Sequence, residues 1–318
     1  MHSSPTLTGA KENPEGTKKI LSVIFFKRIC KFAKRCKMKK NGGFVFLFLF
    51  FTIVVCFSQE LIPQFDKTVT FLNVYNNGKY NPYGTGFLVS IPAKTQQGDY
   101  IYLVTAKHVL QTNKKLLKNI FARFNTKDSS EMFNVPLIWS GASKTVFTHS
   151  DSTVDIAVIP IVVPSNLDYK HIPISQIGKR SEFDSLHINV GTELFFTGLF
   201  TAYTGTKLIN PIFRFGRLCL IPKERIEFDG IYRELLLIES STFGGNSGSP
   251  VIFYFQYGNS VNVRLAGVVL GGFNQGQVLG KSKDQDIVTW SSLGISAVTP
   301  SEFIIEILNS IELLKKRK

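Results

Sequence analysis

From Phe65 onward the chain is a series of short apolar or alternating segments separated by turn-forming residues. Segments of five to eight residues that are rich in Val, Ile, Phe and Tyr are typical of β-strands. No long helical pattern alternates with them, so a parallel sheet with crossover helices is excluded. The spacing favours an all-β sandwich or barrel. The clearest strand candidates are residues 68–75, 84–92, 99–106, 155–163, 192–200, 234–240, 249–255 and 263–272.

Two helices are predicted, a short one after His108 and a longer one at residues 300–314. Thr299 is placed to be the N-cap of the second helix, with Pro300 at its first position and Glu302 completing a capping box. One face of it is apolar, and we interpret it as a packed terminal helix without a chemical role. That face consists of Phe303, Ile304, Ile307, Leu308, Ile311 and Leu314.

The formal net charge of +14 comes almost entirely from the two ends of the 318-residue chain. Residues 1–58 hold 11 Lys and Arg against two Glu, and the basic tail 315–318 holds four more Lys and Arg. Residues 59–314, called the body below, therefore hold 22 basic and 21 acidic residues. A nearly neutral body argues against a broad face for binding phosphate backbones. We therefore expect no nucleic-acid partner.

Residues 1–58 are predicted to be a basic leader followed by a signal peptide or an N-terminal membrane anchor. Met38 and two lysines precede 14 apolar or near-apolar residues, Phe44–Phe57. A run of this length fits the core of a secretory signal better than a bilayer span of about 20 residues. Cleavage after Ser58 would release a periplasmic or secreted protein, and an uncleaved segment would instead anchor it to a membrane.

The cysteines agree with export of a protein without disulfides. Cys30, Cys36 and Cys56 lie in the leader, and only Cys219 lies in the body. Val55, directly before Cys56, is too bulky for a typical lipoprotein processing site. No disulfide within the processed chain and no Cys-based zinc site is expected.

The sequence STFGGNSGSPVIF, residues 241–253, raises the possibility of a serine nucleophile. A serine needs a neighbouring base and a group that orients this base. All five histidines precede residue 188, whereas in an α/β-hydrolase the histidine follows the serine, and Ser249 stands where the G-x-S-x-G motif requires glycine. The subtilisin order of Asp, His and Ser is compatible with the chain, but the local pattern that opens a helix is missing. The order His, Asp, Ser remains.

Three segments in that order, LVTAKHV, DIAVI and GGNSGSPV, resemble the signature segments of trypsin-like (chymotrypsin-fold) serine proteases, nearest the bacterial HtrA-like branch. YGTGFLVS and LGISAVTP extend the resemblance over residues of about 67–314. It implies two antiparallel six-stranded β-barrels with a C-terminal helix. The N-terminal barrel would span about 67–180 and the C-terminal barrel about 186–298. The PDZ domain that usually follows in the HtrA-like branch is not expected, because only 71 residues follow Ser247.

The resemblance also implies an exported serine endopeptidase that acts on polypeptides through an acyl-enzyme. His108 would be the general base, Asp155 its orienting carboxylate and Ser247 the nucleophile, with the backbone N–H groups of Gly245 and Ser247 as oxyanion hole. Asp155 begins an apolar strand, where a charge needs a partner. Asn246 stands where zymogen-activated members have Asp, so activity without precursor cleavage is predicted.

The primary substrate pocket is predicted at Ser241 and along the strand wall 265–271, with Ala266, Gly267 and Val268. Neither part is charged, which favours a small or apolar side chain before the cut. The rival base, His149, is expected in an exposed loop, and His171 and His187 at the surface. No metal or organic cofactor is implied.

Two alternatives stay open. The first is a catalytically inactive, protease-like module that binds peptides. The second is a serine esterase or transferase on the same scaffold.

Overall fold

The computed structural model describes residues 62–93, 98–112, 115–137, 145–258, 260–282 and 285–317. The predicted leader and signal segment, residues 1–58, therefore lie outside the described residues. Within the described ranges, no helix has both the length and the apolar character needed to cross a membrane.

The first half of the body is an antiparallel sheet with the strand order β7-β6-β1-β2-β3-β9-β8, to which β10 adds in parallel beside β2. Asn77 and Gly78 join β1 to β2 with positive φ values of 50° and 76°, the pattern of a type I′ hairpin turn. The strands are β1 (Val69–Asn76), β2 (Lys79–Pro92), β3 (Asp99–Ala106), β6 (Ile120–Asn125), β7 (Met132–Pro136), β8 (Phe147–Thr148), β9 (Ile156–Pro160) and β10 (Ile172–Pro173). Its described strands thus form an eight-stranded sheet, in place of the predicted six-stranded barrel, because β8 and β10 are additional two-residue strands.

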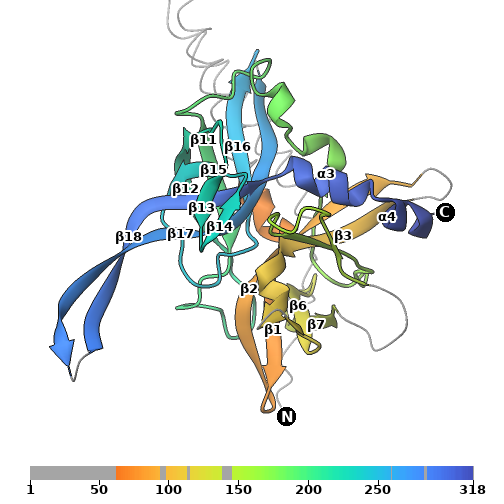
Figure 1. The fold of residues 1–318 in the computed structure, drawn as a ribbon. Coiled ribbons are helices and arrows are strands. Elements are labelled where there is room, and N and C mark those ends of the chain that lie inside the picture. The colour runs from red at the N-terminus through yellow and green to blue at the C-terminus, as the bar shows by residue number, and fades with distance from the viewer. Residues whose placement is uncertain are drawn as a thin grey trace, which may run out of the picture. The chain divides into compact units, whose positions relative to one another are not determined.

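The second half contains the predicted six-stranded barrel, which closes in the order β11-β12-β15-β18-β17-β16. The strands are β11 (Glu193–Gly198), β12 (Ile212–Leu220), β15 (Leu236–Glu239), β16 (Pro250–Tyr257), β17 (Ser260–Ser282) and β18 (Gln285–Pro300). A small hairpin of β13 (Ile226–Phe228) and β14 (Ile231–Arg233) lies between β12 and β15 in the chain. β17 and β18 extend beyond the barrel as a long two-stranded arm (Figure 1).

The region after His108 is not a helix of the predicted length. A single 3₁₀ turn, η2 (Lys107–Leu110), leads into a short hairpin of β4 (Gln111–Thr112) and β5 (Lys115–Leu116). The remaining 3₁₀ segments are η1 (Ile62–Thr68), η3 (Ile174–Gln176) and η4 (Arg180–Glu182).

The terminal helix is divided into α3 (Glu302–Leu308) and α4 (Ile311–Lys316). Thr299 is not its N-cap, because β18 continues to Pro300 and Thr299 pairs with Val268. The break changes which residues are covered: Leu313 is buried, whereas Ile311 is 73% exposed and Leu314 is 43% exposed. The predicted apolar face is therefore confirmed only for the residues of α3.

One hydrophobic core joins both halves and the terminal helix. Phe65 and Phe195 make an edge-to-face contact with ring centroids 5.3 Å apart, and Ile304 and Ile307 of α3 belong to the same cluster. The Arg317 guanidinium donates to the Tyr102 hydroxyl at 2.7 Å, which fastens the end of the chain to β3. The prediction of an all-β fold with a C-terminal helix is confirmed. The terminal helical segment follows the second half in the chain but packs against the first half.

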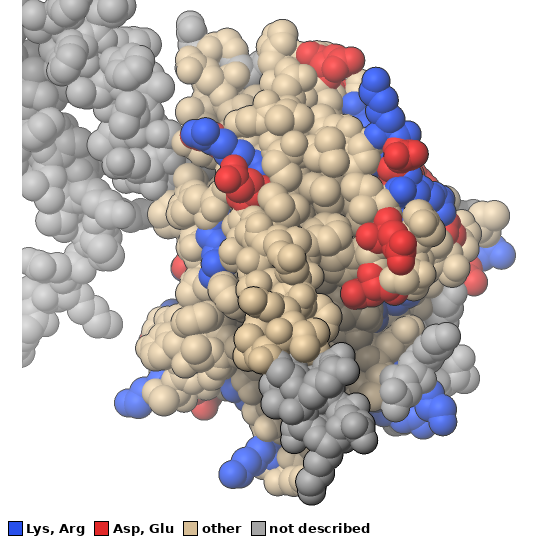
Figure 2. All heavy atoms as spheres, turned by 60° about the vertical axis from the view of Figure 1, so that its left-hand side comes forward, with Lys and Arg blue, Asp and Glu red and all other residues tan. Residues whose placement is uncertain are grey.

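Charged side chains of both signs are interspersed on the face of the molecule in Figure 2, and most of that face is uncharged. This distribution agrees with the nearly neutral body expected from the sequence.

Candidate active site

The register of two strands brings His108 and Asp155 together. Ala106 at the end of β3 pairs with Ile156 at the start of β9, so the residues just beyond this pair adjoin. The His108 N–H donates to Asp155 Oδ1 at 3.0 Å, and His108 Nδ1 lies 2.5 Å from Asp155 Oδ2. Asp155 is 3% exposed, and the side chain of His108 is 47% exposed. A proton on Nδ1, held by this carboxylate, leaves Nε2 free to act as a base.

Lys107 fixes the segment that carries Asp155. Its N–H donates to the Asp155 carbonyl at 3.1 Å, and its ammonium donates to the carbonyls of Ser152 and Val154 at 2.8 and 3.0 Å. Burial lowers the pKa of Lys107, an effect that the neighbouring Asp155 opposes. Lys107 therefore holds the segment from Ser152 to Asp155 through three of its backbone carbonyls.

Ser247 lies in a glycine turn that contacts the first half of the body. Gly248 has a φ of +88°, and a Cβ atom there would lie 2.0 Å from the Thr85 carbonyl oxygen. The Thr85 N–H donates to the Ser247 carbonyl at 3.0 Å, and the Gly248 N–H donates to the Val269 carbonyl at 2.9 Å. Only glycine fits this close approach, so the sequence requires it for a steric reason.

The preceding turn leaves two N–H groups beside the serine. The Asn246 N–H donates to the Phe243 carbonyl at 3.0 Å, and Gly245 has a φ of +96°, as the third residue of a type II turn requires. The Thr85 hydroxyl donates to the Gly245 carbonyl at 2.8 Å. In the described part of the chain, the N–H groups of Gly245 and Ser247 donate to no other protein group. They are thus available to a bound oxyanion.

Asn246 holds this turn without a charge. It is 1% exposed, its amide donates to the Leu199 carbonyl at 2.7 Å, and its Oδ1 accepts from the Phe243 N–H at 2.9 Å. Both functions of its side chain are satisfied inside the protein.

The three predicted triad residues line the same cavity, which has a volume of about 400 Å³. It is lined by His108, Asp155, Ser247, Phe228, Asp229, Arg233, Leu270, Gly271, Gly272 and Asn274. The Ser247 hydroxyl donates to the Leu270 carbonyl at 3.1 Å, and no hydrogen bond joins it to His108 among the contacts of the described residues. The base and the serine therefore share one cavity, with the serine turned toward β17.

The predicted pocket residues Ala266, Gly267 and Val268 do not line this cavity. Ala266 and Val268 are buried, and a Cβ on Gly267 would lie 2.2 Å from the Thr299 carbonyl, because β16 and β18 flank this part of β17. The cavity wall is the next part of the same strand, from Leu270 to Asn274.

Ser241, predicted for the substrate pocket, and Ser249, two residues after Ser247, have contrasting surroundings. Ser241 is half-buried in the segment before the glycine turn and is not among the residues that line the cavity. Ser249 is fully buried, and its hydroxyl has no partner in the described structure. A nucleophilic role for Ser249 is excluded by its burial.

The β13–β14 hairpin was not among the predicted strands, yet it supplies Phe228, Asp229 and Arg233 to the cavity. The available signal was the Asp229-Gly230 dipeptide between short apolar segments, which favours a two-residue hairpin turn. Asp229 and Gly230 have φ values of 50° and 71°, as a type I′ turn requires.

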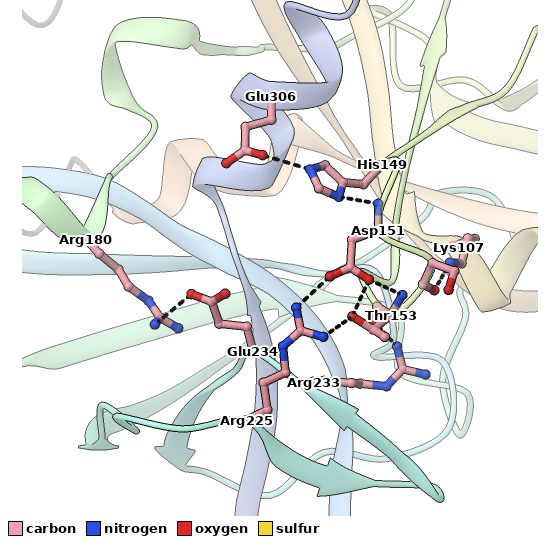
Figure 3. A network of polar contacts seen from close by, with 10 residues as sticks. Lys107, His149, Asp151, Thr153, Arg180, Arg225, Arg233, Glu234 and Glu306 are labelled. Carbon is pink, nitrogen blue, oxygen red and sulfur yellow. Dashed lines mark hydrogen bonds and ion pairs between the residues drawn. The ribbon is translucent and has the colours of Figure 1, made fainter.

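A polar network, drawn in Figure 3, joins the loop before Asp155 to the second half of the body. Asp151 accepts from the hydroxyl and N–H of Thr153 at 2.7 and 2.9 Å, and Arg225 donates to it at 2.7 Å. These contacts, with the Thr153 bonds first, hold the pKa of Asp151 well below its usual range. The Arg233 guanidinium donates to the Thr153 carbonyl.

His149 belongs to this network, and the prediction that it lies in an exposed loop is wrong. Its side chain is 14% exposed, Nε2 lies 2.8 Å from Glu306 Oε2, and its ring contacts Phe303. It does not line the cavity with Ser247. His171 is half-buried, and His187 lies at the surface.

No trio of His, Cys, Asp and Glu side chains converges to hold a metal ion in the described ranges.

No protein-family model and no curated protein matches the chain. Many solved structures are similar to it, among them the two that follow. One is the apo form of the MamO protease domain from Magnetospirillum magneticum, which has 13% sequence identity and a TM-score of 0.47. The matched region covers 79% of this chain and 100% of that domain. The other is human heparin binding protein, which has 12% sequence identity and a TM-score of 0.43. The matched region covers 78% of this chain and 94% of that protein. At these values, neither likeness assigns the chain to a family or an activity.

Proposed function

We propose that this chain is a serine endopeptidase of the trypsin-like kind, with His108, Asp155 and Ser247 as its catalytic triad. The observation that carries the proposal is the 2.5 Å contact between His108 Nδ1 and Asp155 Oδ2 in a cavity that Ser247 also lines. The two N–H groups of the glycine turn support it further. The trypsin-like signature segments of the sequence point to the same residues.

In the proposed reaction, Ser247 Oγ attacks the peptide carbonyl carbon while its proton passes to His108 Nε2. The oxyanion accepts hydrogen bonds from the N–H groups of Gly245 and Ser247, and each such donor typically contributes about 100- to 1,000-fold in rate. His108 then protonates the leaving amine as the C–N bond breaks, and water hydrolyses the acyl ester by the reverse transfers. Asp155 stays ionised and stabilises the imidazolium.

The substrate would bind as a strand along β17. On one side β17 pairs with β18, and on the other its pairing with β16 ends at Pro250 and Val268. The Leu270–Asn274 edge that faces away from β18 therefore has no strand partner in the described structure. An extended peptide can add antiparallel to such an edge. Its N–H would take the Leu270 carbonyl and release the Ser247 hydroxyl to turn toward His108.

The residue directly before the cut would have a small side chain. Gly272 and Thr242 approach closely, because a Cβ on Gly272 would lie 2.7 Å from Thr242 Oγ1. The Ser296 hydroxyl donates to Thr242 Oγ1 at 3.1 Å, and none of these three residues is charged. This supports the expectation of a small or apolar residue at the cut.

Activity would not require precursor cleavage, since Asn246 already holds the turn through neutral hydrogen bonds. Export, inferred from the leader sequence, and the HtrA-like relationship remain parts of the same proposal.

The second candidate is a peptide-binding module without activity. The observation that favours it is the Ser247 hydroxyl, which donates to Leu270 and not to His108.

Fluorophosphonate labelling of the full chain, with mass spectrometry to locate the adduct, separates the two candidates. A protease or an esterase is expected to be labelled on Ser247, and His108→Ala is expected to abolish the adduct. Ser249→Ala is a matched control, because that buried hydroxyl has no partner. No adduct on a folded chain would favour the binding module, and hydrolysis of esters but not peptides would favour the esterase.

A further inference from the structure

We propose that Asp229 forms a subsite for a Lys or Arg side chain of the substrate, at the second or fourth residue before the cut. The proposal rests on the proposed function, because it places the peptide along the free edge of β17. It goes further by naming a class of substrate that neither the sequence motifs nor the triad indicates.

The position of Asp229 is fixed by the hairpin that carries it. Its type I′ turn has φ values of 50° at Asp229 and 71° at Gly230. Phe228 is 8% exposed, packs edge to face on Phe273 at 5.0 Å, and its Cζ lies 3.1 Å from where a Cβ of Gly271 would be. The hairpin tip is thus fastened to β17, and Asp229 lines the same cavity as His108 and Ser247.

Asp229 is the charged group of this cavity that has no partner among the described residues. Its side chain is exposed and makes no hydrogen bond or ion pair there. Asp155 is buried against His108, and the Arg233 guanidinium donates to the Thr153 carbonyl. An unpaired carboxylate in a partly enclosed cavity attracts a cation and repels an anion.

The geometry of a bound strand selects the substrate positions. An antiparallel peptide on the Leu270–Asn274 edge would have its N-terminal residues beside Gly272 and Asn274. Side chains alternate along a strand, so the second and fourth residues before the cut share the face opposite to the first. A lysine there could lay its methylene stem against Phe228 and direct its ammonium to Asp229.

The test uses pairs of fluorogenic peptides that differ only by Lys or norleucine at the second or fourth position before the cut. The full chain is expected to prefer Lys by about tenfold in kcat/KM at low salt, and the preference should shrink at 0.5 M NaCl. Asp229→Asn keeps a residue that tolerates positive φ, and is expected to abolish the preference for Lys over norleucine. Glu227→Gln, on the exposed side of the same hairpin, removes an equal charge outside the cavity and should keep the preference.

Binding of the same peptides to Ser247→Ala, measured by fluorescence anisotropy, separates this proposal from the proposed function. A lysine preference in binding that depends on Asp229 supports the subsite even if no peptide is cut. Equal binding and equal cleavage of both peptides, or an equal effect of Glu227→Gln, would overturn it. A preference for norleucine over Lys would overturn it too.

Discussion

Thr85→Val offers a sharp test of how the first half of the body shapes the serine turn. The Thr85 hydroxyl is completely buried, donates to the Gly245 carbonyl at 2.8 Å and accepts from the Leu199 N–H at 2.9 Å. Valine keeps the shape and removes both bonds, which leaves two buried backbone groups unsatisfied. At about 1.5 kcal/mol for each orphaned group, the free energy of unfolding should fall by about 3 kcal/mol. Tm should then fall by about 6–12 °C for a body of this size.

The same change should act on catalysis, because the Gly245 carbonyl fixes the peptide plane that follows the proposed oxyanion donor. We expect kcat to fall by about 10- to 100-fold while KM changes less than twofold, as for an interaction made in the transition state. Thr197→Val is the matched control: Thr197 is also fully buried, but its hydroxyl has no partner in the described structure. Differential scanning calorimetry and steady-state kinetics at 20 °C would measure both effects. If Thr85→Val is no worse than Thr197→Val in either measurement, the turn does not depend on this hydroxyl.

Three further predictions test other parts of the structure. Because the pKa of Asp151 is depressed in the folded chain, its stabilising effect is complete above its unfolded value of about 3.9 and declines as pH falls from there toward the lower folded value; Asp151→Asn should therefore lower Tm more at pH 7 than at pH 2.5. Leu313→Ala should cost about 2–4 kcal/mol in chemical unfolding and Ile311→Ala less than about 0.5, because the first is fully buried and the second is 73% exposed; the reverse order would contradict the helix break. Asn246→Asp should lower Tm and slow fluorophosphonate labelling at least tenfold at pH 8, since it replaces the donor to the Leu199 carbonyl by a buried charge; an unchanged labelling rate would show that the turn does not need this donor.

The sequence predicted best what local patterns control. Strand candidates of five to eight apolar residues correspond to β1, β3, β9, β11, β15 and β16, because short runs rich in Val, Ile and Phe and bounded by turn residues are visible in the sequence itself. The closeness of His108 and Asp155 also follows from local position, since each lies next to the end of a strand and these two strands pair. Glycine is required at 245 and 248 because both residues have positive φ values, a property of the turn that the resemblance alone does not specify.

At the start of the terminal helix, tertiary contacts override the local capping signal. Thr299, Pro300 and Glu302 match a capping box, yet Thr299 pairs with Val268, and Glu302 accepts from the Arg180 N–H at 3.1 Å. The strand pairing includes both the predicted N-cap, Thr299, and the predicted first helical residue, Pro300, because β17 offers a partner to each. A capping motif is a local preference of about 1 kcal/mol, which a few paired residues of a sheet can override.

The hairpin over the cavity shows why the candidate specificity site was not predictable. β13 and β14 are three residues each, too short for a periodic signal, and their turn predicts only a hairpin. What makes this hairpin part of the site is the absence of a side chain at Gly271, which lets Phe228 approach β17 to within van der Waals distance. That contact joins residues 43 positions apart and has no signature in either segment alone. The triad follows from motifs because its members must have fixed chemistry, whereas a subsite such as the one proposed at Asp229 needs only a charge in the right place, which the fold alone can define.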